Sequence, residues 1–229
     1  MILPLGIKES FVSNLILEDR WKLMLAGLDV TLEVSVLSLL FGTLAGALLC
    51  FMRMSRNRVV SGTAKGYIEL MRSLPLLLLL LVLFYLVFAS SSLGKIQVAI
   101  VCFSLYFGAY FCEIFRSGIQ GVDKGQWEAG AALGMGKGLV LRKIILPQAL
   151  FRMLPVYKNQ MTALIKATSI VGYVSIMDIT KTSDLIRSRT FDAFFPLLLT
   201  AIVYLLLSWL FGLLADALQK RFTPKSRKP

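Results

Sequence analysis

Long uncharged, apolar runs alternate with short charged segments along this chain of 229 residues. Between flanking charges, four runs cover residues 34–52, 73–94, 96–112 and 193–215, which are 19, 22, 17 and 23 residues long. A fifth apolar stretch at 153–177 carries Lys158 and Lys166. Roughly 20 apolar residues suffice for a helix to cross the hydrocarbon core of a bilayer. The pattern predicts an all-α integral membrane protein with about five transmembrane helices.

The pattern also predicts how the chain is organised. We expect an external lead-in segment at 1–27, a transmembrane domain at 28–218 and a basic cytoplasmic tail at 219–229. The lead-in mixes charged and apolar residues and lacks the basic start and apolar core of a signal peptide. The expected spans lie near 28–52, 73–94, 95–112, 155–177 and 193–215, with a polar external loop at 178–192.

Composition supports a membrane protein, and charge gives its orientation. Hydrophobic residues make up 57% of the chain, whereas soluble domains contain about 45–50%. The net charge is +12, and 17 of the 25 basic residues fall in the segments near 53–72 and 113–158 and in the tail. Basic residues collect on the cytoplasmic side of membrane proteins. The charge therefore predicts an external N-terminus and a cytoplasmic C-terminus, and it gives no reason to expect binding to nucleic acid.

The residue inventory argues against catalytic and metal sites in this chain. It contains no histidine, which is the commonest general base and metal ligand. Its three cysteines, Cys50, Cys102 and Cys112, lie in apolar runs, where free cysteine behaves as a small hydrophobe. Gly136 and Lys137 do not complete a phosphate loop, because an upstream Gly at position 131 and a following Ser or Thr are missing. We expect any ATP to be hydrolysed elsewhere.

A glycine-punctuated basic segment separates the third run from the fourth. Asp123 followed by Gln126 predicts a capping box that starts a helix at about 124–133, which Gly134 and Gly136 would end. A second short helix is expected at about 139–145, ended by Pro147. Glu128 is expected near the start of the first helix, where the dipole favours a negative charge. The segment is either a docking element for a soluble partner or an ordinary loop helix without one.

Two further groups of residues are candidates for a translocation path. Arg72, Ser73, Leu74 and Pro75 precede the second apolar run, and Arg72 can pair with Glu69 on one helix face. Lys166 lies inside the fourth span, where a lysine costs about 2.5–3.5 kcal/mol. Thr168 and Ser169 follow it. Lys166 faces an interior pathway, pairs structurally or snorkels to the interface.

The segment from Glu128 to Pro147 closely resembles the loop that marks permeases of ABC importers. The family pattern is Glu-Ala-Ala, three residues, Gly, nine residues, Ile, one residue and Leu-Pro. It is matched by Glu128, Ala129, Gly134, Ile144, Leu146 and Pro147, whereas Gly130 replaces the second Ala. Further stretches at 67–75, 113–119, 125–129, 146–149 and 166–169 resemble the polar amino acid branch of these permeases. The resemblance covers about residues 27–218.

The resemblance implies a type I ABC importer permease with a cytoplasmic coupling-helix loop in a bacterial inner membrane. That loop would contain Asp123 and Gly125 together with the six residues that match the pattern. The implied partners are a second permease copy or paralogue, two ATP-binding subunits and an extracytoplasmic amino-acid-binding protein, all assembled in or on a lipid bilayer. ATP and Mg²⁺ would be held by the ATP-binding subunits, so this chain itself needs no cofactor.

Two departures from the branch bear on the cargo. Arg72-Ser73-Leu74-Pro75 stands where the branch usually has Arg-Gly-Thr-Pro, and Ala167 stands where many members have Asp. Without that carboxylate, Lys166 leaves a positive potential, which favours a neutral or acidic amino acid such as glutamine or glutamate. Two other classes remain open: a secondary transporter or channel, although the chain lacks a doubled repeat, and a membrane enzyme relying on Asp, Glu or Lys.

Overall fold

The computed structural model describes residues 6–222, and no β-strand occurs within that range. Helices follow one another through short breaks, which confirms the predicted all-α class. The α-helices are α1 (Ile7–Phe11), α2 (Arg20–Arg53), α3 (Arg58–Ser73), α4 (Leu76–Val82), α5 (Lys95–Gln120), α6 (Lys124–Ala132), α7 (Lys137–Val140), α8 (Leu146–Ala167), α9 (Ile179–Thr190) and α10 (Phe194–Phe222). Wider π-helical turns occupy Val12–Ile16, Leu83–Val87 and Leu141–Ile145, and tighter 3-10 turns occupy Leu17–Asp19 and Thr168–Val174.

Helix length and hydropathy allow between three and five membrane spans among the described residues. Three single helical stretches qualify: Lys8–Arg53, Lys95–Gln120 and Phe194–Ala217. Two pairs of helices are bent at a short break, and the number of spans rises to five if each pair counts as one span. These pairs are Arg58–Ser73 with Leu76–Val87, and Lys137–Val174 with Ile179–Thr190. The predicted five spans agree with the upper count.

The described chain divides into two compact units. Unit 1 comprises residues 6–40, 75–103 and 163–209 of the described part. Unit 2 comprises residues 41–74, 104–162 and 210–222. Helices α2, α5, α8 and α10 each contribute residues to both units. The predicted domain boundary between 27 and 28 falls inside α2, which begins at Arg20, and residues 1–5 and 223–229 of the predicted lead-in and tail lie outside the described residues.

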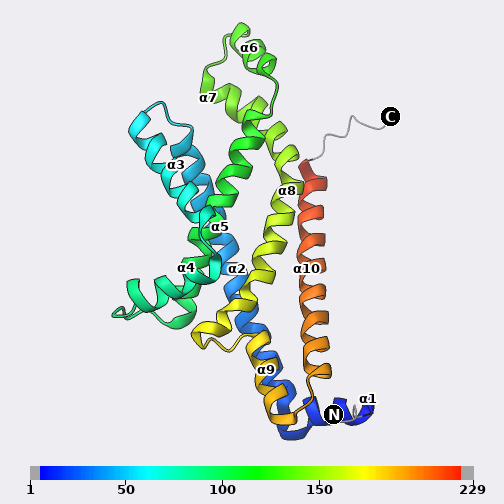
Figure 1. The fold of residues 1–229 in the computed structure, drawn as a ribbon. Helices are drawn as coiled ribbons and strands as arrows, with labels where there is room; N and C mark the ends of the chain where they lie inside the picture. Colours follow the sequence, from blue (N-terminus) through cyan, green and yellow to red (C-terminus); the bar gives the residue numbers. More distant parts are fainter. Residues whose placement is uncertain (1–5, 223–229) are drawn as a thin grey trace. The chain divides into compact units, whose positions relative to one another are not determined.

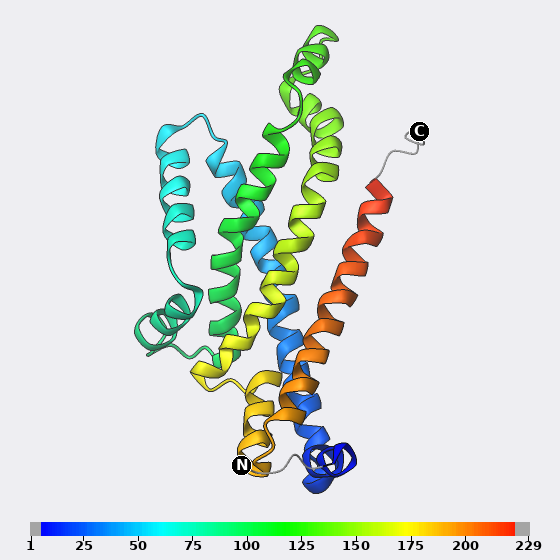
Figure 2. The same cartoon turned by 45° about the vertical axis from the view of Figure 1, so that its right-hand side comes forward.

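In unit 1, α9 packs against the first part of α2 and against the first part of α10 (Figure 2). Ile179 and Ile186 of α9 are each 1% exposed and form a cluster with Met24 of α2. Asp178 is fully buried and caps α9, accepting hydrogen bonds from the backbone N–H of Lys181 at 2.9 Å and of Thr180 at 3.1 Å. Side-chain capping supplies partners for the free amides at a helix start.

The segment at 178–192 was predicted to be a polar external loop, and that prediction was wrong for most of its length. It folds as α9 because its apolar and small polar residues repeat at helical spacing and bury one face. The sequence conceals this face, since the charged residues Lys181, Asp184 and Arg187 dominate its composition. The buried positions on α9 are Ile179, Thr182, Ser183 and Ile186.

A second group of polar contacts in unit 1 joins the residues before α2 to the α9–α10 connection. Asn14 donates a hydrogen bond to Asp192 at 2.7 Å, and the backbone N–H of Phe194 donates to the same carboxylate at 3.1 Å. Partial burial alone would raise the pKa of Asp192, but hydrogen bonds from Ser10, Asn14 and the backbone lower this pKa overall. The carboxylate therefore stays charged and holds the connection in place.

Unit 2 is organised around a close contact between α2 and α5. Gly46 lies against α5 so closely that a Cβ added there would be 2.6 Å from the Cβ of Phe111. Gly42 and Gly46 are four residues apart, a spacing of small residues that lets two helices approach closely. Thr43 and Tyr157 share a hydrogen bond of 2.6 Å, which attaches α8 to the same contact.

The second predicted span contains a shorter helix than expected. The apolar run 73–94 is helical only over Leu76–Val87, as α4 and a π-helical turn. Leu74 and Pro75 have extended backbones, with ψ of 139° and 131°, and they separate α3 from α4. A residue before proline is displaced from the helical region, so α3 ends at Ser73. Pro75 therefore caps α4 from outside and does not form its first helical turn.

Candidate functional site

The loop between α5 and α8 begins with a capped helix, as the sequence predicted. Asp123 is the N-cap of α6, and its carboxylate accepts a hydrogen bond from the backbone N–H of Gly125 at 2.6 Å. The predicted capping box also requires the Gln126 side chain to bond back to the backbone of Asp123, and this bond is not what Gln126 forms. Gln126 instead accepts a hydrogen bond from Gln148 of α8 at 3.2 Å, so its side chain links two helices. Glu128 is the fifth residue of α6, in its second turn, where the helix dipole acts weakly.

Gly134 ends α6 through backbone geometry that only a residue without a side chain adopts freely. Its φ is +73°, in the left-handed region. The N–H of Met135 donates to the carbonyl of Gly130 at 3.0 Å, and the N–H of Gly134 donates to Ala131 at 2.9 Å. This pair of bonds is the Schellman arrangement at a helix C-terminus. The glycine of the sequence pattern thus has a structural reason.

Gly130, which departs from the family pattern, lies where α6 packs on the following turns. A Cβ added there would be 2.6 Å from Cγ2 of Val140 and 3.4 Å from Cδ1 of Ile144. Val140 and Gly130 are both buried. Glycine at position 130, in place of the alanine of the family pattern, therefore leaves room for the side chain of Val140 on α7. The sequence pattern alone did not reveal this contact, because it involves residues ten positions apart.

Pro147 does not end a helix, contrary to the prediction for 139–145. Lys137–Val140 forms α7, a π-helical turn covers Leu141–Ile145, and α8 starts at Leu146 without a break. Proline lacks an N–H and has a fixed φ, both of which a first helical turn accepts. Ile144 and Leu146 are half-buried in this segment and Pro147 is exposed.

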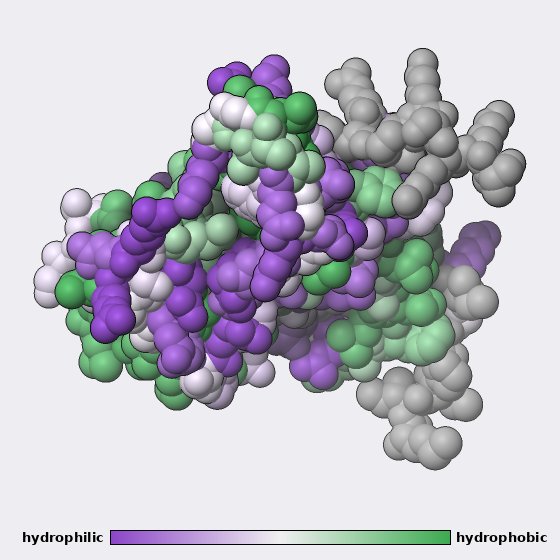
Figure 3. All heavy atoms as spheres, turned by 90° about the horizontal axis from the view of Figure 1, so that it is seen from above, coloured by the Kyte–Doolittle hydropathy of each residue, from purple (hydrophilic) through white to green (hydrophobic). Residues whose placement is uncertain are grey.

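Helix α6 forms a tip of unit 2 that projects beyond the ends of α5 and α8 (Figure 1). Glu128 and Ala129 are exposed, and Leu133 is 79% exposed. Seen from this end, hydrophilic residues dominate the surface, with a hydrophobic patch at the tip (Figure 3). An exposed leucine beside an exposed carboxylate on a fixed helix is suited to contact a partner.

The sequence did not identify the residues that hold this tip in place. Arg152 of α8 donates a hydrogen bond from Nη1 to the carbonyl of Gly121, the residue after α5. Gln148 of the same helix donates to Gln126 of α6 at 3.2 Å and to the carbonyl of Ile144 at 3.0 Å. Both side chains belong to α8, so the loop is attached to that helix at two places. A clue was present, since Gln148 and Arg152 are four residues apart and can share one helix face.

The candidate pathway residues of unit 2 lie at the end of α3. The guanidinium carbon of Arg72 is 5.4 Å from the ring centroid of Tyr110 on α5, an arrangement that attracts a cation to the ring face. Ser73 is exposed, and its hydroxyl donates to the carbonyl of Glu69 at 2.7 Å. The predicted pairing of Arg72 with Glu69 is not formed. Glu69 pairs with Lys65 at 3.6 Å.

The remaining candidates belong to unit 1 and are not brought into one cluster. Lys166 is exposed near the end of α8. Thr168 is buried and donates to the carbonyl of Ile165 at 2.7 Å. Ser169 lines a pocket of about 670 Å³, together with residues of α9 that include Lys181, Asp184 and Arg187. This pocket was not predicted from the sequence, because residues 178–192 were expected to form a loop.

The described residues show no metal-binding constellation: no group of three His, Cys, Asp or Glu side chains converges in residues 6–222. The three cysteines are buried and not joined as disulfides. The described features are those of a helical membrane protein that presents one ordered polar loop.

These features agree with comparisons to known proteins. The chain belongs to the family of binding-protein-dependent transport system inner membrane components, whose profile matches residues 38–228. It is therefore a membrane-spanning permease subunit of such a transport system.

Relatives with stated cargoes belong to amino acid transport systems. The chain is 35% identical over 200 residues to a putative glutamine transport system permease protein of Rickettsia bellii, covering 85% of this chain and 90% of that protein. It is 36% identical over 208 residues to a glutamate/aspartate import permease protein of Escherichia coli O6:H1, covering 86% and 92%. An L-cystine transport system permease protein of Bacillus subtilis is 31% identical, covering 91% and 90%.

Solved structures confirm the fold. An amino acid ABC transporter crystallised with histidines has a chain that aligns with a TM-score of 0.80 and 32% identity, covering 88% of this chain and 94% of that one. A chain of the MetNI methionine ABC transporter in an inward-facing conformation aligns with a TM-score of 0.73 and 20% identity, covering 90% and 99%. The second likeness concerns the fold alone.

Proposed function

We propose that this chain is the permease subunit of an ATP-driven importer of polar amino acids. The observation that carries the proposal is α6, a short helix capped at Asp123, ended at Gly134 and attached to α8, with Glu128, Ala129 and Leu133 exposed. A rigid projecting helix can transmit a displacement of a soluble subunit to α5 and α8, whereas a flexible loop would absorb that displacement. Interfaces of this kind shift as rigid bodies between two states.

The proposed assembly contains a second permease, identical or related, two ATP-binding subunits and an extracytoplasmic binding protein. ATP and Mg²⁺ are held by the ATP-binding subunits, and this permease carries no catalytic residue. Large apolar residues along α2 and α10 are exposed, including Leu48 at 63% and Leu205 at 67%. Such surfaces require lipid or another subunit as cover.

The proposed cargo is a neutral or acidic amino acid, with glutamine and glutamate favoured. Lys166 supplies positive charge and Ala167 supplies no carboxylate, so a cationic cargo lacks a local partner at this position. The relatives named for glutamine, glutamate/aspartate and cystine transport support an uncharged or acidic cargo.

Uptake by the reconstituted importer tests this proposal. The vesicles contain the permease with its ATP-binding subunits, and the binding protein and labelled cargo are added outside. They should accumulate labelled glutamine or glutamate when ATP is supplied inside. An ion gradient without ATP should give no accumulation, which separates an importer from a secondary transporter. Excess arginine inhibiting better than glutamine and glutamate would reject the cargo assignment while leaving the ATP-driven class intact.

The proposed orientation is an external N-terminus and a cytoplasmic C-terminus, which the distribution of basic residues supports. Ser91 is exposed in the connection before α5. In a cysteine-free background, a membrane-impermeant maleimide should label Ser91→Cys from outside intact cells. Ser226→Cys, at a position outside the described residues, should react only after the membrane is opened. The opposite result would reverse the orientation.

A further inference from the structure

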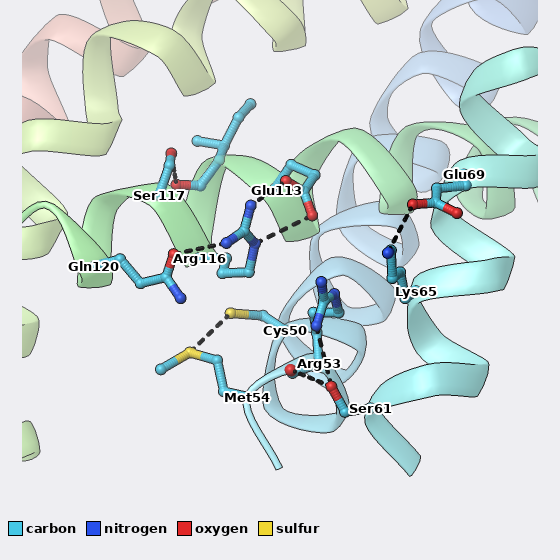
Figure 4. Close-up of polar contacts among 11 residues, drawn as sticks. Cys50, Arg53, Met54, Ser61, Lys65, Glu69, Glu113, Arg116, Ser117 and Gln120 are labelled. Atoms are coloured by element: carbon cyan, nitrogen blue, oxygen red, sulfur yellow. Dashed lines mark hydrogen bonds and ion pairs between the residues drawn. The ribbon is translucent and has the colours of Figure 1, made fainter. Parts of the chain in front are cut away.

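A line of polar contacts on α5 is not used by the proposed function so far. Glu113, Arg116 and Gln120 are three and four residues apart and share one face of the helix. Arg116 donates from Nη2 to Glu113 at 2.6 Å and from Nε to the other carboxylate oxygen at 3.2 Å. Its Nη1 donates to Gln120 at 2.6 Å (Figure 4). The guanidinium therefore joins the two neighbours through three hydrogen bonds.

Beyond its ion pair with Arg116, the Glu113 carboxylate is attracted by the charges of arginines on two other helices of unit 2. The charges of Arg72 on α3 and Arg53 on α2 both stabilise the charged carboxylate. Arg72 also lies over the ring of Tyr110, one turn before Glu113 on α5. Arg53 donates to the hydroxyl of Ser61 at 3.1 Å. One carboxylate thus compensates arginines from α2, α3 and α5.

The other end of the line reaches the base of the α6 loop. Gln120 is the last residue of α5, and the next carbonyl, that of Gly121, accepts the hydrogen bond from Arg152. Asp123, two residues further on, caps α6. The backbone of residues 121–123 connects the start of α6 to Gln120, and side-chain hydrogen bonds continue from Gln120 through Arg116 to Glu113, whose charge attracts Arg72.

The charge balance indicates which residue controls this line. The side chains of Glu113 and Arg116 are 25% and 26% exposed, so solvent screens their interaction only partly. Without the Glu113 charge, the mutual repulsion of Arg53, Arg72 and Arg116 would no longer be offset by that carboxylate. Arg72 is exposed, whereas Arg116 is still held by Gln120 and Arg53 by Ser61. The repulsion would act mainly on the position of Arg72.

We propose that Glu113 is a positioning residue that holds Arg72 and transmits displacement of the α6 base to the end of α3. When the α6 base moves, Gln120 and Arg116 move with α5, and Arg72 follows through its contact with Tyr110 and its attraction to the Glu113 charge. Arg72 directly precedes Ser73 and the extended residue Leu74, which are candidate pathway residues. This inference rests on the proposed function, because it assumes that α6 receives the displacement from an ATP-binding subunit.

The test uses the complete importer in vesicles and a positional readout at Ser73. In a cysteine-free background, Ser73→Cys is labelled with a small maleimide in the nucleotide-free and the ATP-trapped complex. The labelling rates should differ between these states, and Glu113→Gln should reduce that difference about fivefold or more. The cargo moved per ATP should fall by a similar factor, while ATP-binding subunits still copurify in normal amounts. Glu113→Asp should retain part of both.

A double-mutant cycle with Arg72→Gln shows whether Glu113 acts through Arg72. If it does, adding Glu113→Gln to Arg72→Gln should change the cargo moved per ATP by less than about twofold, because coupled residues are not additive. Glu69→Gln is the matched control, since Glu69 forms an exposed ion pair with Lys65 in the same unit (Figure 4). It should leave both readouts unchanged. If Glu113→Gln does not insert, Gln120→Leu interrupts the same line without changing charge.

Two results would overturn the inference: an unchanged difference in Ser73→Cys labelling in Glu113→Gln, or effects of Glu113→Gln and Arg72→Gln that simply add. Either result leaves the proposed function intact, because the unmutated complex still imports its cargo. Failure of the unmutated complex to import with ATP would reject the proposed function and the inference together.

Discussion

At the scale of single residues, backbone requirements explain the loop better than side-chain identity does. Gly134 has a φ of +73° and no atom within 4 Å of an added Cβ. A side chain at position 134 would therefore strain the backbone but would not clash with neighbouring atoms. Gly136 and Gly138 also have open space, but their φ lies outside the left-handed region. Among these three glycines, only Gly134 needs the conformation that glycine alone adopts readily.

Gly134→Asp should consequently weaken the end of α6 by up to about 1–2 kcal/mol, the cost of a left-handed backbone for a residue with a side chain. ATP-driven uptake should fall while the amount of inserted permease remains normal. Gly138→Asp, which places the same side chain in open space at an ordinary φ, is the control and should keep most uptake. Equal activity of both variants would show that the turn at Gly134 is not required.

Residue patterns predicted the ends of α6 well, because capping by Asp123 and termination by Gly134 are local. They failed where a distant partner decides. Gln126 bonds to Gln148 and does not complete a capping box, and Glu69 pairs with Lys65 while Arg72 lies over Tyr110. Spacing identifies which residues can meet within a helix, but it does not include the competing residues on other helices.

At the scale of elements, the apolar runs predicted where helices lie but not where they break. The run 73–94 is uniformly apolar, yet its helix covers only Leu76–Val87. Conversely, charged residues concealed α9, which packs through Ile179 and Ile186. Hydropathy reports the average environment of a segment, whereas helix ends and buried faces depend on particular neighbours.

The contact of α2 with α9 in unit 1 gives a prediction about stability. A Cβ added to Gly27 would be 2.6 Å from Oγ1 of Thr182 and 2.9 Å from the backbone oxygen of Asp178. A backbone atom cannot move away cheaply, so Gly27→Ala should cost about 1–3 kcal/mol, as overpacking does. Thermal unfolding of the detergent-solubilised permease should show a lower midpoint.

Gly62→Ala is the matched control for that measurement. Gly62 lies inside α3, and nothing is within 4 Å of a Cβ added there. Alanine favours a helix over glycine by about 1 kcal/mol, so this variant should unfold at the same or a higher temperature. A Gly27→Ala midpoint at or above that of the unmutated permease would contradict the close α2–α9 contact.

At the scale of the whole molecule, family membership agrees with the predicted helical class. The candidate residues, however, are divided between the two units. The loop residues and Arg72 belong to unit 2, whereas Lys166, Thr168 and Ser169 belong to unit 1. The sequence pattern identified the loop because its spacing is long and fixed. It could not assign the pathway, because the pathway that we propose is shared with a second permease, whose surface this chain does not contain.

The central claim is that α6 couples ATP hydrolysis by a partner to movement of cargo. The most direct test measures labelled amino acid imported per ATP hydrolysed by the reconstituted importer carrying Glu128→Lys. Reversing an exposed charge at a docking surface costs several kcal/mol, so import should fall roughly tenfold or more while the permease still inserts. Glu69→Lys, which reverses an exposed carboxylate on α3, should retain import. Normal ATP-driven import by Glu128→Lys would contradict the account.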